Sequence, residues 1–346
     1  MTHARSLIHI MACMFAGCAN GLQPGDDAIT DKVEGSARRM PAEWEPQAAV
    51  WLQWPQSWEG ARVQQAFVEI VSVLARYEDV ELVVNSDADE ANARSALADV
   101  DLSRVSFHPI DIDSSWMRDN GPRYIEVDGQ LVMQNWEFDG WGSVNGSRTY
   151  ARDNAVPDTV AGILGLEIEQ VGLIHERGDL EVNGVDTAIV SWSVLSDRNP
   201  DLSRDEITGV FQEALGVSSV VYTEGYDPLD ITMGHVDGMV RFVSADTVVV
   251  GQDGSQLLDD VAGQIAEQRP DLEMVRLVAA DAALFMNYLV GDGYVLMGDS
   301  RDADQNAYAQ AMLEGFYPGR DVHFVNVDAL WFNGGGVHCV TNDQPE

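Results

Sequence analysis

Cys339 is the residue whose type and setting most directly suggest chemistry. It ends the run Gly334–Cys339, which reads GGGVHC, while the other two cysteines, Cys13 and Cys18, lie near the N-terminus. The region after Cys18 therefore holds a single thiol and no internal disulfide. Glycine lets a substrate approach the backbone closely, so a thiol in such a turn suits a nucleophile. A buried packing cysteine is the alternative.

The residues best able to act with this thiol are three carboxylates and a histidine: Asp119, Glu176, Asp237 and His235. Such a set could ligate zinc, but the paired ligand spacings HExxH and CxxC do not occur in the chain. A thiol protease would use Cys339, His235 and Asp237. Papain-like enzymes, however, carry the cysteine near the mature start of the chain, and two carboxylates would have no function. Neither interpretation explains so many acids around one thiol.

A planar cation explains the acids. A guanidinium is always charged and offers its donors in a fixed fork that paired carboxylates match. A thiolate can attack its central carbon, and the bound cation lowers the pKa of the thiol. His235 can give a proton to the leaving ammonia and later activate the hydrolytic water. The products are a ureido group and ammonia, and the reaction requires no metal or organic cofactor.

One structural pattern recurs five times from residue 40 onward. An amphipathic helix is followed by a short apolar strand, a polar or glycine-bearing segment and usually a hairpin. The third helix begins with a capping-box pattern at Ser203 and Glu206 and stops at Gly216. The other expected helices contain 63–74, 158–164, 257–265 and 307–316; the five strands are 80–84, 166–171, 217–222, 272–278 and 322–327; the hairpins are 124–133, 180–190, 239–250 and 288–297.

Repetition of one unit favours radial or solenoid stacking over an open doubly wound sheet. Five units close naturally into a ring, so we expect an α/β fold of five blades around a central site. The segment 49–54 would complete the blade that the C-terminus begins. Each unit contributes candidate residues from its polar segment, in the order Asp119, Glu176, His235 with Asp237, Asn287, and Cys339.

The chain is strongly acidic, with a formal net charge of -37 and Lys32 as its only lysine. This charge disfavours nucleic acid and anionic membrane surfaces as partners and attracts cationic ligands. A solvated surface suited to high salt is an equally simple explanation.

The N-terminus has the pattern of an export signal. An apolar run from Leu7 to Phe15 follows Arg5, and the residues 15–18, FAGC, resemble a bacterial lipobox. We predict a lipoprotein signal peptide over 1–17, a lipid anchor on Cys18 and a flexible acidic linker over 18–38. Residues 39–346 then form a single catalytic domain of an exported protein, periplasmic or at the cell surface.

Four ordered motifs resemble those of the agmatine deiminase and bacterial peptidylarginine deiminase family, in the guanidine-modifying pentein superfamily. They are MPAEWEP at 40–46, WMRDNGP at 116–122, GHVD at 234–237 and GGVHC at 335–339. The resemblance implies a five-bladed αβ propeller with pseudo-fivefold symmetry. It also implies residue roles: Cys339 as nucleophile, His235 and Glu176 in acid–base steps, and Asp119, Asp237, Asn287 and Trp116 in substrate binding.

The family default implied by this resemblance is hydrolysis of agmatine to N-carbamoylputrescine and ammonia. Peptidyl or free arginine, giving citrulline, is the alternative substrate. An alternative of another class is a non-catalytic surface lipoprotein that binds guanidinium compounds.

The chain departs from the agmatine pattern at several positions. The family's Glu-Gly-Gly is Glu176-Arg177-Gly178 here, and the loop after 136–142 carries Arg148 and Arg152. An arginine near the substrate would repel a distal ammonium and could pair with a carboxylate. These arginines could instead bridge surface acids.

Overall fold

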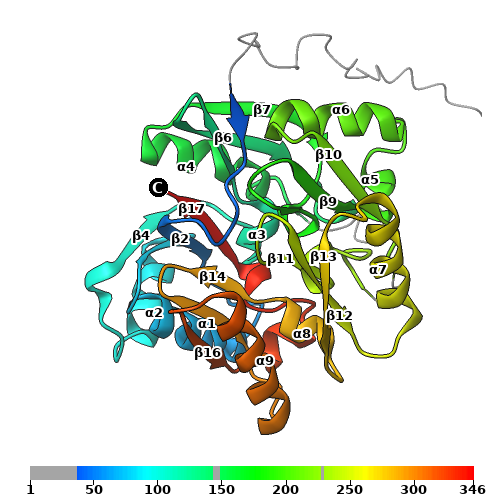
Figure 1. The fold of residues 1–346 in the computed structure, drawn as a ribbon. Helices are drawn as coiled ribbons and strands as arrows, with labels where there is room; N and C mark the ends of the chain where they lie inside the picture. Colours follow the sequence, from blue (N-terminus) through cyan, green and yellow to red (C-terminus); the bar gives the residue numbers. More distant parts are fainter. Residues whose placement is uncertain (1–36, 143–148, 227–229) are drawn as a thin grey trace, which may run out of the picture.

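The computed structural model describes residues 37–142, 149–226 and 230–346, shown as a ribbon in Figure 1. The predicted signal peptide, Cys18 and Arg148 lie outside the described residues, as does the predicted linker up to residue 36. Arg38, placed at the end of that linker, pairs with Val127. None of the helices in the described ranges combines the length and apolar character that a membrane span needs.

The strands in the described ranges form five separate sheets, with helices packed around them (Figure 1). The class predicted from the sequence, α/β, is confirmed. The sheet orders are β1-β5-β6-β7, β10-β9-β8, β11-β12-β13, β14-β15-β16 and β17-β2-β3-β4. The strands are β1 Arg38–Arg39, β2 Gln47–Gln53, β3 Asp79–Val84, β4 Val105–Pro109, β5 Arg123–Val127, β6 Gln130–Glu137, β7 Ile168–Ile174, β8 Glu181–Val182, β9 Thr187–Ser191, β10 Ser219–Thr223, β11 Val240–Phe242, β12 Thr247–Gln252, β13 Glu273–Val278, β14 Leu289–Gly291, β15 Tyr294–Gly298, β16 Asp321–Val325 and β17 Thr341–Pro345.

The same local unit builds each sheet. In four of them two antiparallel strands form a hairpin, and the chain returns through a helix to a third strand that pairs in parallel, as β6 does with β7. Parallel neighbours need such a crossover connection. The helices are α1 Ala61–Leu74, α2 Asp87–Ala96, α3 Met117–Asn120, α4 Val156–Leu164, α5 Trp192–Arg198, α6 Arg204–Leu215, α7 Gln256–Gln268, α8 Ala282–Met286, α9 Ala303–Phe316 and α10 Asp328–Phe332.

Local sequence signals explain why these helices begin and end where they do. Ser203 and Glu206 form the predicted capping box of α6, and Gly216 ends the helix with a φ of 74°, a conformation that glycine adopts easily. The expected apolar face of α1 is buried, including Phe67 and Ile70. All five predicted helices and their strands are present, with ends that differ by a few residues.

The segment 49–54 and the C-terminal strand share one sheet, as the sequence predicted. β17 pairs with β2 in antiparallel fashion, so residues from the two ends of the described chain share one sheet. The fourth strand of this sheet, β4, and the helix α2 that precedes it in the chain were not expected. α2 buries only Ala93, and β4 has a single buried residue, Val105, so neither carries a strong apolar pattern.

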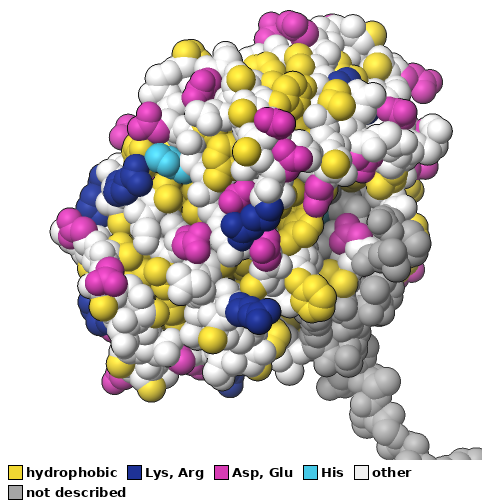
Figure 2. All heavy atoms as spheres, turned by 90° about the horizontal axis from the view of Figure 1, so that it is seen from below, with side chains coloured by type: hydrophobic (Ala, Val, Ile, Leu, Met, Phe, Trp, Pro, Cys, Tyr) yellow, Lys and Arg dark blue, Asp and Glu magenta, His cyan; other side chains and the backbone are white. Residues whose placement is uncertain are grey.

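Acidic, apolar and uncharged side chains are interspersed on the face of the molecule shown in Figure 2, where basic groups stand singly or in small groups. The apolar side chains gather instead inside, between each sheet and its helices. The polar segments that connect the strands and helices are not part of these apolar cores and are available to form the site.

Candidate functional site

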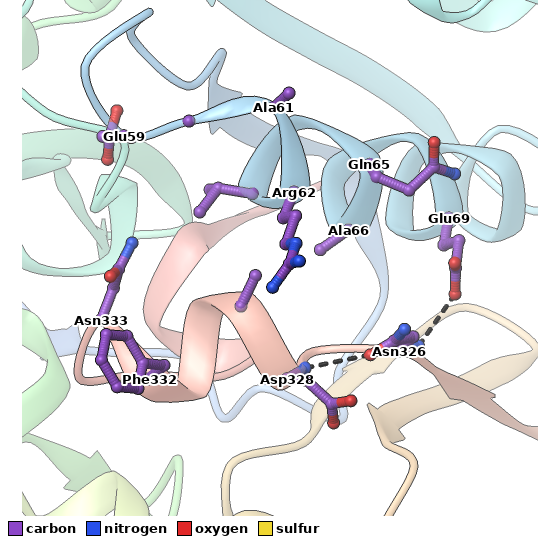
Figure 3. A pocket seen from close by; sticks show the side chains of 13 residues that line it. Glu59, Ala61, Arg62, Gln65, Ala66, Glu69, Asn326, Asp328, Phe332 and Asn333 are labelled. Carbon is purple, nitrogen blue, oxygen red and sulfur yellow. Dashed lines mark hydrogen bonds between the residues drawn. The ribbon is translucent and has the colours of Figure 1, made fainter.

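The candidate site is a cavity of about 420 Å³ where polar segments from several sheets meet. Cys339, His235, Asp237 and Asn287 all contribute to its lining. A larger cavity of about 770 Å³ lies between α1 and α10, with Arg62 and Phe332 among its labelled residues (Figure 3). No predicted site residue lines that larger cavity, so size alone would have selected the wrong place.

Asp119 is held by the short helix α3, which follows Trp116. Its Oδ2 accepts a 2.8 Å hydrogen bond from the indole Nε1 of Trp141, and its Oδ1 accepts one of 3.2 Å from the backbone of Gly178. Nδ1 of His235 lies 3.6 Å from the same Oδ1. Asp119 is therefore buried and fixed, but its neighbours do not saturate it.

Glu176 and His235 face each other across a gap. Oε2 of Glu176 lies 3.7 Å from Nε2 of His235, beyond hydrogen-bond distance, and neither of these buried atoms has a hydrogen-bond partner. The other oxygen, Oε1, accepts a 2.8 Å bond from Nε of Arg198. The two atoms lie within ion-pair distance of each other, and because buried polar atoms are nearly always hydrogen-bonded, each has hydrogen-bonding capacity left for a ligand.

Cys339 lies beside Asp237 and Asn287, and all three residues line the cavity. Nδ2 of Asn287 is 3.1 Å from Sγ of Cys339 and 3.1 Å from Oδ2 of Asp237, and Sγ is 3.5 Å from that oxygen. Oδ1 of Asn287 accepts a 3.1 Å bond from the backbone nitrogen of His338. The asparagine thus ties the thiol to the carboxylate.

Three glycines line this arrangement because larger residues would not fit. A Cβ on Gly178 would lie 2.6 Å from Oδ1 of Asp119, and one on Gly335 would lie 2.5 Å from the ring of Trp116. A Cβ on Gly336 would lie 2.6 Å from Oδ1 of Asn287. Trp116 is accordingly packed against the glycine-rich turn that carries the thiol.

The charges of the cavity change the acidity of its members. Burial disfavours protonation of His235, but the carboxylates of Asp119 and Glu176 outweigh it and raise the pKa to about 10. Burial raises the pKa of Asp119 to about 6, although His235 opposes this. Burial and the negative charges of Asp237 and Asp119 raise the pKa of Cys339 well above its usual value. At neutral pH the empty cavity thus holds an imidazolium and a protonated thiol.

A second group of charges, here called the floor cluster, lies directly behind the cavity. It contains Glu43, Arg118, Arg177, His338 and Asp343. Arg177 donates to both oxygens of Asp343 at 2.8 Å, and Arg118 donates to Oδ1 of the same carboxylate at 2.8 Å. The hypothesis that Arg177 binds a substrate carboxylate is therefore wrong, because its guanidinium is buried and already paired.

Arg152 also lies outside the cavity lining. Its side chain is 58 % exposed, and its Nε lies 4.0 Å from Oδ1 of Asp113, in keeping with the alternative of a bridge between surface charges.

Sequence reasoning missed two side chains that hold the site. Arg198 binds Glu176, and nothing in its local sequence distinguishes it from a surface arginine. Trp141 belongs to the motif at 136–142, but only the fold shows that its indole reaches Asp119. Within the described ranges, no group of three histidine, cysteine or acidic residues could hold a metal ion.

Known proteins are similar to this chain in both sequence and fold. The agmatine deiminase of Pseudomonas putida is 29% identical, over 88% of this chain and 95% of its own length. That of Stutzerimonas stutzeri is 30% identical over the same shares.

Two solved structures, 23% and 19% identical, show the same fold. The agmatine deiminase of Enterococcus faecalis superposes with a TM-score of 0.81 over 90% of this chain and 96% of its own. That of C. jejuni, with substrate bound, gives a TM-score of 0.82 over 92% and 99%. Residues 39–345 match the family described as Porphyromonas-type peptidyl-arginine deiminase, and the chain belongs to that family.

Proposed function

We propose that this protein is a hydrolytic deiminase that removes ammonia from a guanidino group through a covalent cysteine intermediate. One observation carries the proposal: the Cys339 thiol lines a cavity with His235 and Asp237, and the buried carboxylates of Asp119 and Glu176 face the same imidazole at 3.6 and 3.7 Å. The family match and the agmatine deiminases among the relatives support the same chemistry.

Binding uses the carboxylates. Asp119 and Asp237 bind the guanidinium, and the unpartnered Oε2 of Glu176 accepts one of its N–H groups. Glu176 is suited to this because it is anionic: burial opposes the charge, but Arg198 and His235 hold its pKa well below the usual range. The cation then lies against carboxylates that otherwise repel one another. The contact stabilises both the bound guanidinium and the ionised carboxylates.

Attack follows from the same charges. In the empty cavity, Asp237 and Asp119 keep Cys339 protonated, and a bound guanidinium reverses that effect because a positive charge favours the thiolate. The thiol proton passes to solvent as the cation binds, and the thiolate attacks the central carbon to give a tetrahedral adduct. His235, present as imidazolium, gives a proton to the leaving amino group, and ammonia departs. The resulting neutral imidazole activates the water that releases the ureido product.

The substrate is agmatine, the decarboxylated form of arginine. Among the described residues, the charged groups that line the cavity are Asp230, His235, Asp237 and Asp253, with no arginine or lysine. A distal ammonium is compatible with such a wall, whereas the carboxylate of arginine would meet further negative charge. Arginine in a peptide is the second candidate, since the matched family is described by that activity.

The five sheets are proposed to be the blades of an αβ propeller, with the site at its centre. Their number and the β2–β17 closure support this arrangement. Export as a lipoprotein anchored at Cys18 is likewise a proposal, supported by the sequence at 1–18.

A ureido-product assay tests the function. The purified protein is given agmatine, free arginine, and peptides with internal or C-terminal arginine, with Cys339→Ala as the control for chemical background. We expect ureido product from agmatine at a higher kcat/KM than from any arginine compound. Binding of agmatine without turnover would favour the non-catalytic alternative, and a preference for peptides would assign the second substrate class.

A further inference from the structure

His338 precedes the nucleophile and joins the cavity wall to the floor cluster. Its side chain is buried, with 1% exposed. Nδ1 lies 2.8 Å from Oδ2 of Asp237, and Nε2 lies 2.8 Å from Oε2 of Glu43. Both ring nitrogens thus face a carboxylate oxygen at hydrogen-bond distance.

This arrangement gives each ring nitrogen a carboxylate partner. A neutral imidazole has one N–H and would present a lone pair to the second carboxylate, whereas an imidazolium donates to both. Both acids are held as anions. Burial opposes the charge of Glu43, but Arg241 and His338 hold its pKa well below the usual range. Burial likewise opposes the charge of Asp237, and His338 lowers its pKa.

Arg118 and Asn287 also contact His338 or its carboxylate partner. Nε of Arg118 donates to the backbone oxygen of His338 at 3.1 Å, and its Nη2 lies 3.6 Å from Oε2 of Glu43. The backbone nitrogen of His338 donates to Asn287. Arg118 thus places a positive charge beside the ring, while the two carboxylates contact the ring nitrogens directly.

The contact with Asp237 has two consequences for the reaction. Oδ2 of Asp237 receives hydrogen bonds from His338 and Asn287, so the carboxylate plane is fixed, as a forked guanidinium contact requires. The same oxygen lies 3.5 Å from Sγ of Cys339, where its charge opposes a thiolate. An imidazolium bound to that oxygen offsets the repulsion.

We propose, as an extension of the deiminase function, that His338 is a positioning residue that acts through Asp237. Clamped between Glu43 and Asp237, its imidazolium orients Asp237 for the guanidinium and stabilises the Cys339 thiolate. It touches neither the substrate nor the leaving group.

Two amide variants separate its two contacts. His338→Asn places an amide nitrogen near the position of Nδ1 and keeps the bond to Asp237, while His338→Gln places it near Nε2 and keeps the contact with Glu43. We expect KM for agmatine to rise at least about tenfold in His338→Gln and clearly less in His338→Asn, since only the first variant loses the hydrogen bond to Asp237, the carboxylate proposed to bind the guanidinium. His108→Asn is the control, because His108 also bonds a carboxylate, that of Glu81, but does not line the cavity.

The rate at which iodoacetamide alkylates Cys339 gives a second readout that needs no turnover. Alkylation is followed by mass spectrometry of the Cys339 peptide in full-length protein, from about pH 7 to about pH 10. We expect both amide variants to react about tenfold more slowly than wild type at a given pH, because neither carries the positive charge. Glu43→Gln should slow the reaction in the same direction, and it carries the test if the His338 variants do not fold.

A wild-type alkylation profile in both amide variants, or in Glu43→Gln when it must stand in for them, would overturn the proposal. An unchanged KM in folded His338→Gln would overturn it as well. If wild type converts no guanidine at all, the proposed function fails, and the alkylation rates still decide the role of His338.

Discussion

Two neighbouring groups of buried charge in this protein are built differently. In the floor cluster, Asp343 receives three hydrogen bonds of 2.8 Å from two guanidinium groups. In the cavity, His235 stands 3.6 Å from Asp119 and 3.7 Å from Glu176. The Asp343 carboxylate of the floor is saturated, although Nη2 of Arg118 has no hydrogen bond, whereas the cavity side has carboxylates in excess of cations. The difference indicates that the ion pairs around Asp343 serve stability and that the cavity is completed by a cation.

The largest expected effect tests the chemistry on the cavity side. Cys339→Ala should lower kcat by several orders of magnitude, because the attacking atom is gone. Agmatine affinity should remain close to that of wild type, since the carboxylates are untouched. Isothermal titration calorimetry and the ureido assay measure the two quantities. Residual turnover at the wild-type rate would exclude the thiol mechanism.

The next effect concerns the floor. Asp343→Asn leaves Arg118 and Arg177 buried without their shared anion and should cost about 3–5 kcal/mol of unfolding free energy. Urea denaturation measures this cost. The exposed ion pair of Arg94 with Glu90 provides the control: Glu90→Gln should cost less than about 1 kcal/mol. Equal losses of unfolding free energy in the two variants would show that the ion pairs around Asp343 contribute no more than an exposed ion pair.

Asp119→Asn should have the opposite effect from Asp343→Asn, because it should weaken substrate binding and leave stability nearly unchanged. It removes one charge-assisted contact with the substrate, worth about 1.5–3 kcal/mol, so KM should rise about tenfold to a hundredfold. Stability should not fall in parallel, because Asp119 is a buried anion beside other anions. A large loss of unfolding free energy with little change in KM would reverse the assignment of the two clusters.

The pH dependence sharpens the role of Asp119. Its pKa is raised to about 6, and only its ionised form attracts the guanidinium. We therefore expect kcat/KM to fall about tenfold per pH unit as the pH drops below about 6. The pH profile of Asp119→Asn should lack this limb. A wild-type profile that stays flat to about pH 4 would show that binding does not depend on this carboxylate.

The smallest effect involves Glu78, a buried acid outside both clusters. Burial raises its pKa to about 7, while the hydroxyl of Tyr294 donates to it and opposes the rise. The folded-state pKa of Glu78 lies above its unfolded-state value. The contribution of Glu78 to the free energy of unfolding is therefore complete at low pH and is lost as the pH rises toward and through about 7. Glu78→Gln should be the more stable protein at about pH 8 by on the order of 1 kcal/mol, and lose that advantage near about pH 5. Thermal unfolding at the two pH values checks this crossover.

The sequence predicted those parts of the molecule that depend on local pattern or on recognised motifs. The capping box of α6 and the buried face of α1 follow from residues only a few positions apart. The gathering of Asp119, Glu176, His235, Asp237, Asn287 and Cys339 was expected from one polar segment in each unit.

The missed features depend on contacts that no local pattern encodes. Arg198 reaches Glu176 from 22 positions away, and Arg177 turns to Asp343 instead of the substrate. α2 was not predicted because Ala93 is its only buried residue, so the helix has no apolar face in the sequence. The direction in which an arginine points depends on the tertiary packing around it.

The pairing of β2 with β17 has a kinetic consequence. Trp51 and Gln344, which bond across this pair, are 293 positions apart, and Cys339 lies two residues before the start of β17. Contacts between such distant segments carry a high loop-closure entropy and form late in folding. During refolding, catalytic activity should therefore return after the helical circular dichroism signal, in step with closure of this last strand. The thiol is then a built-in reporter of the final folding event.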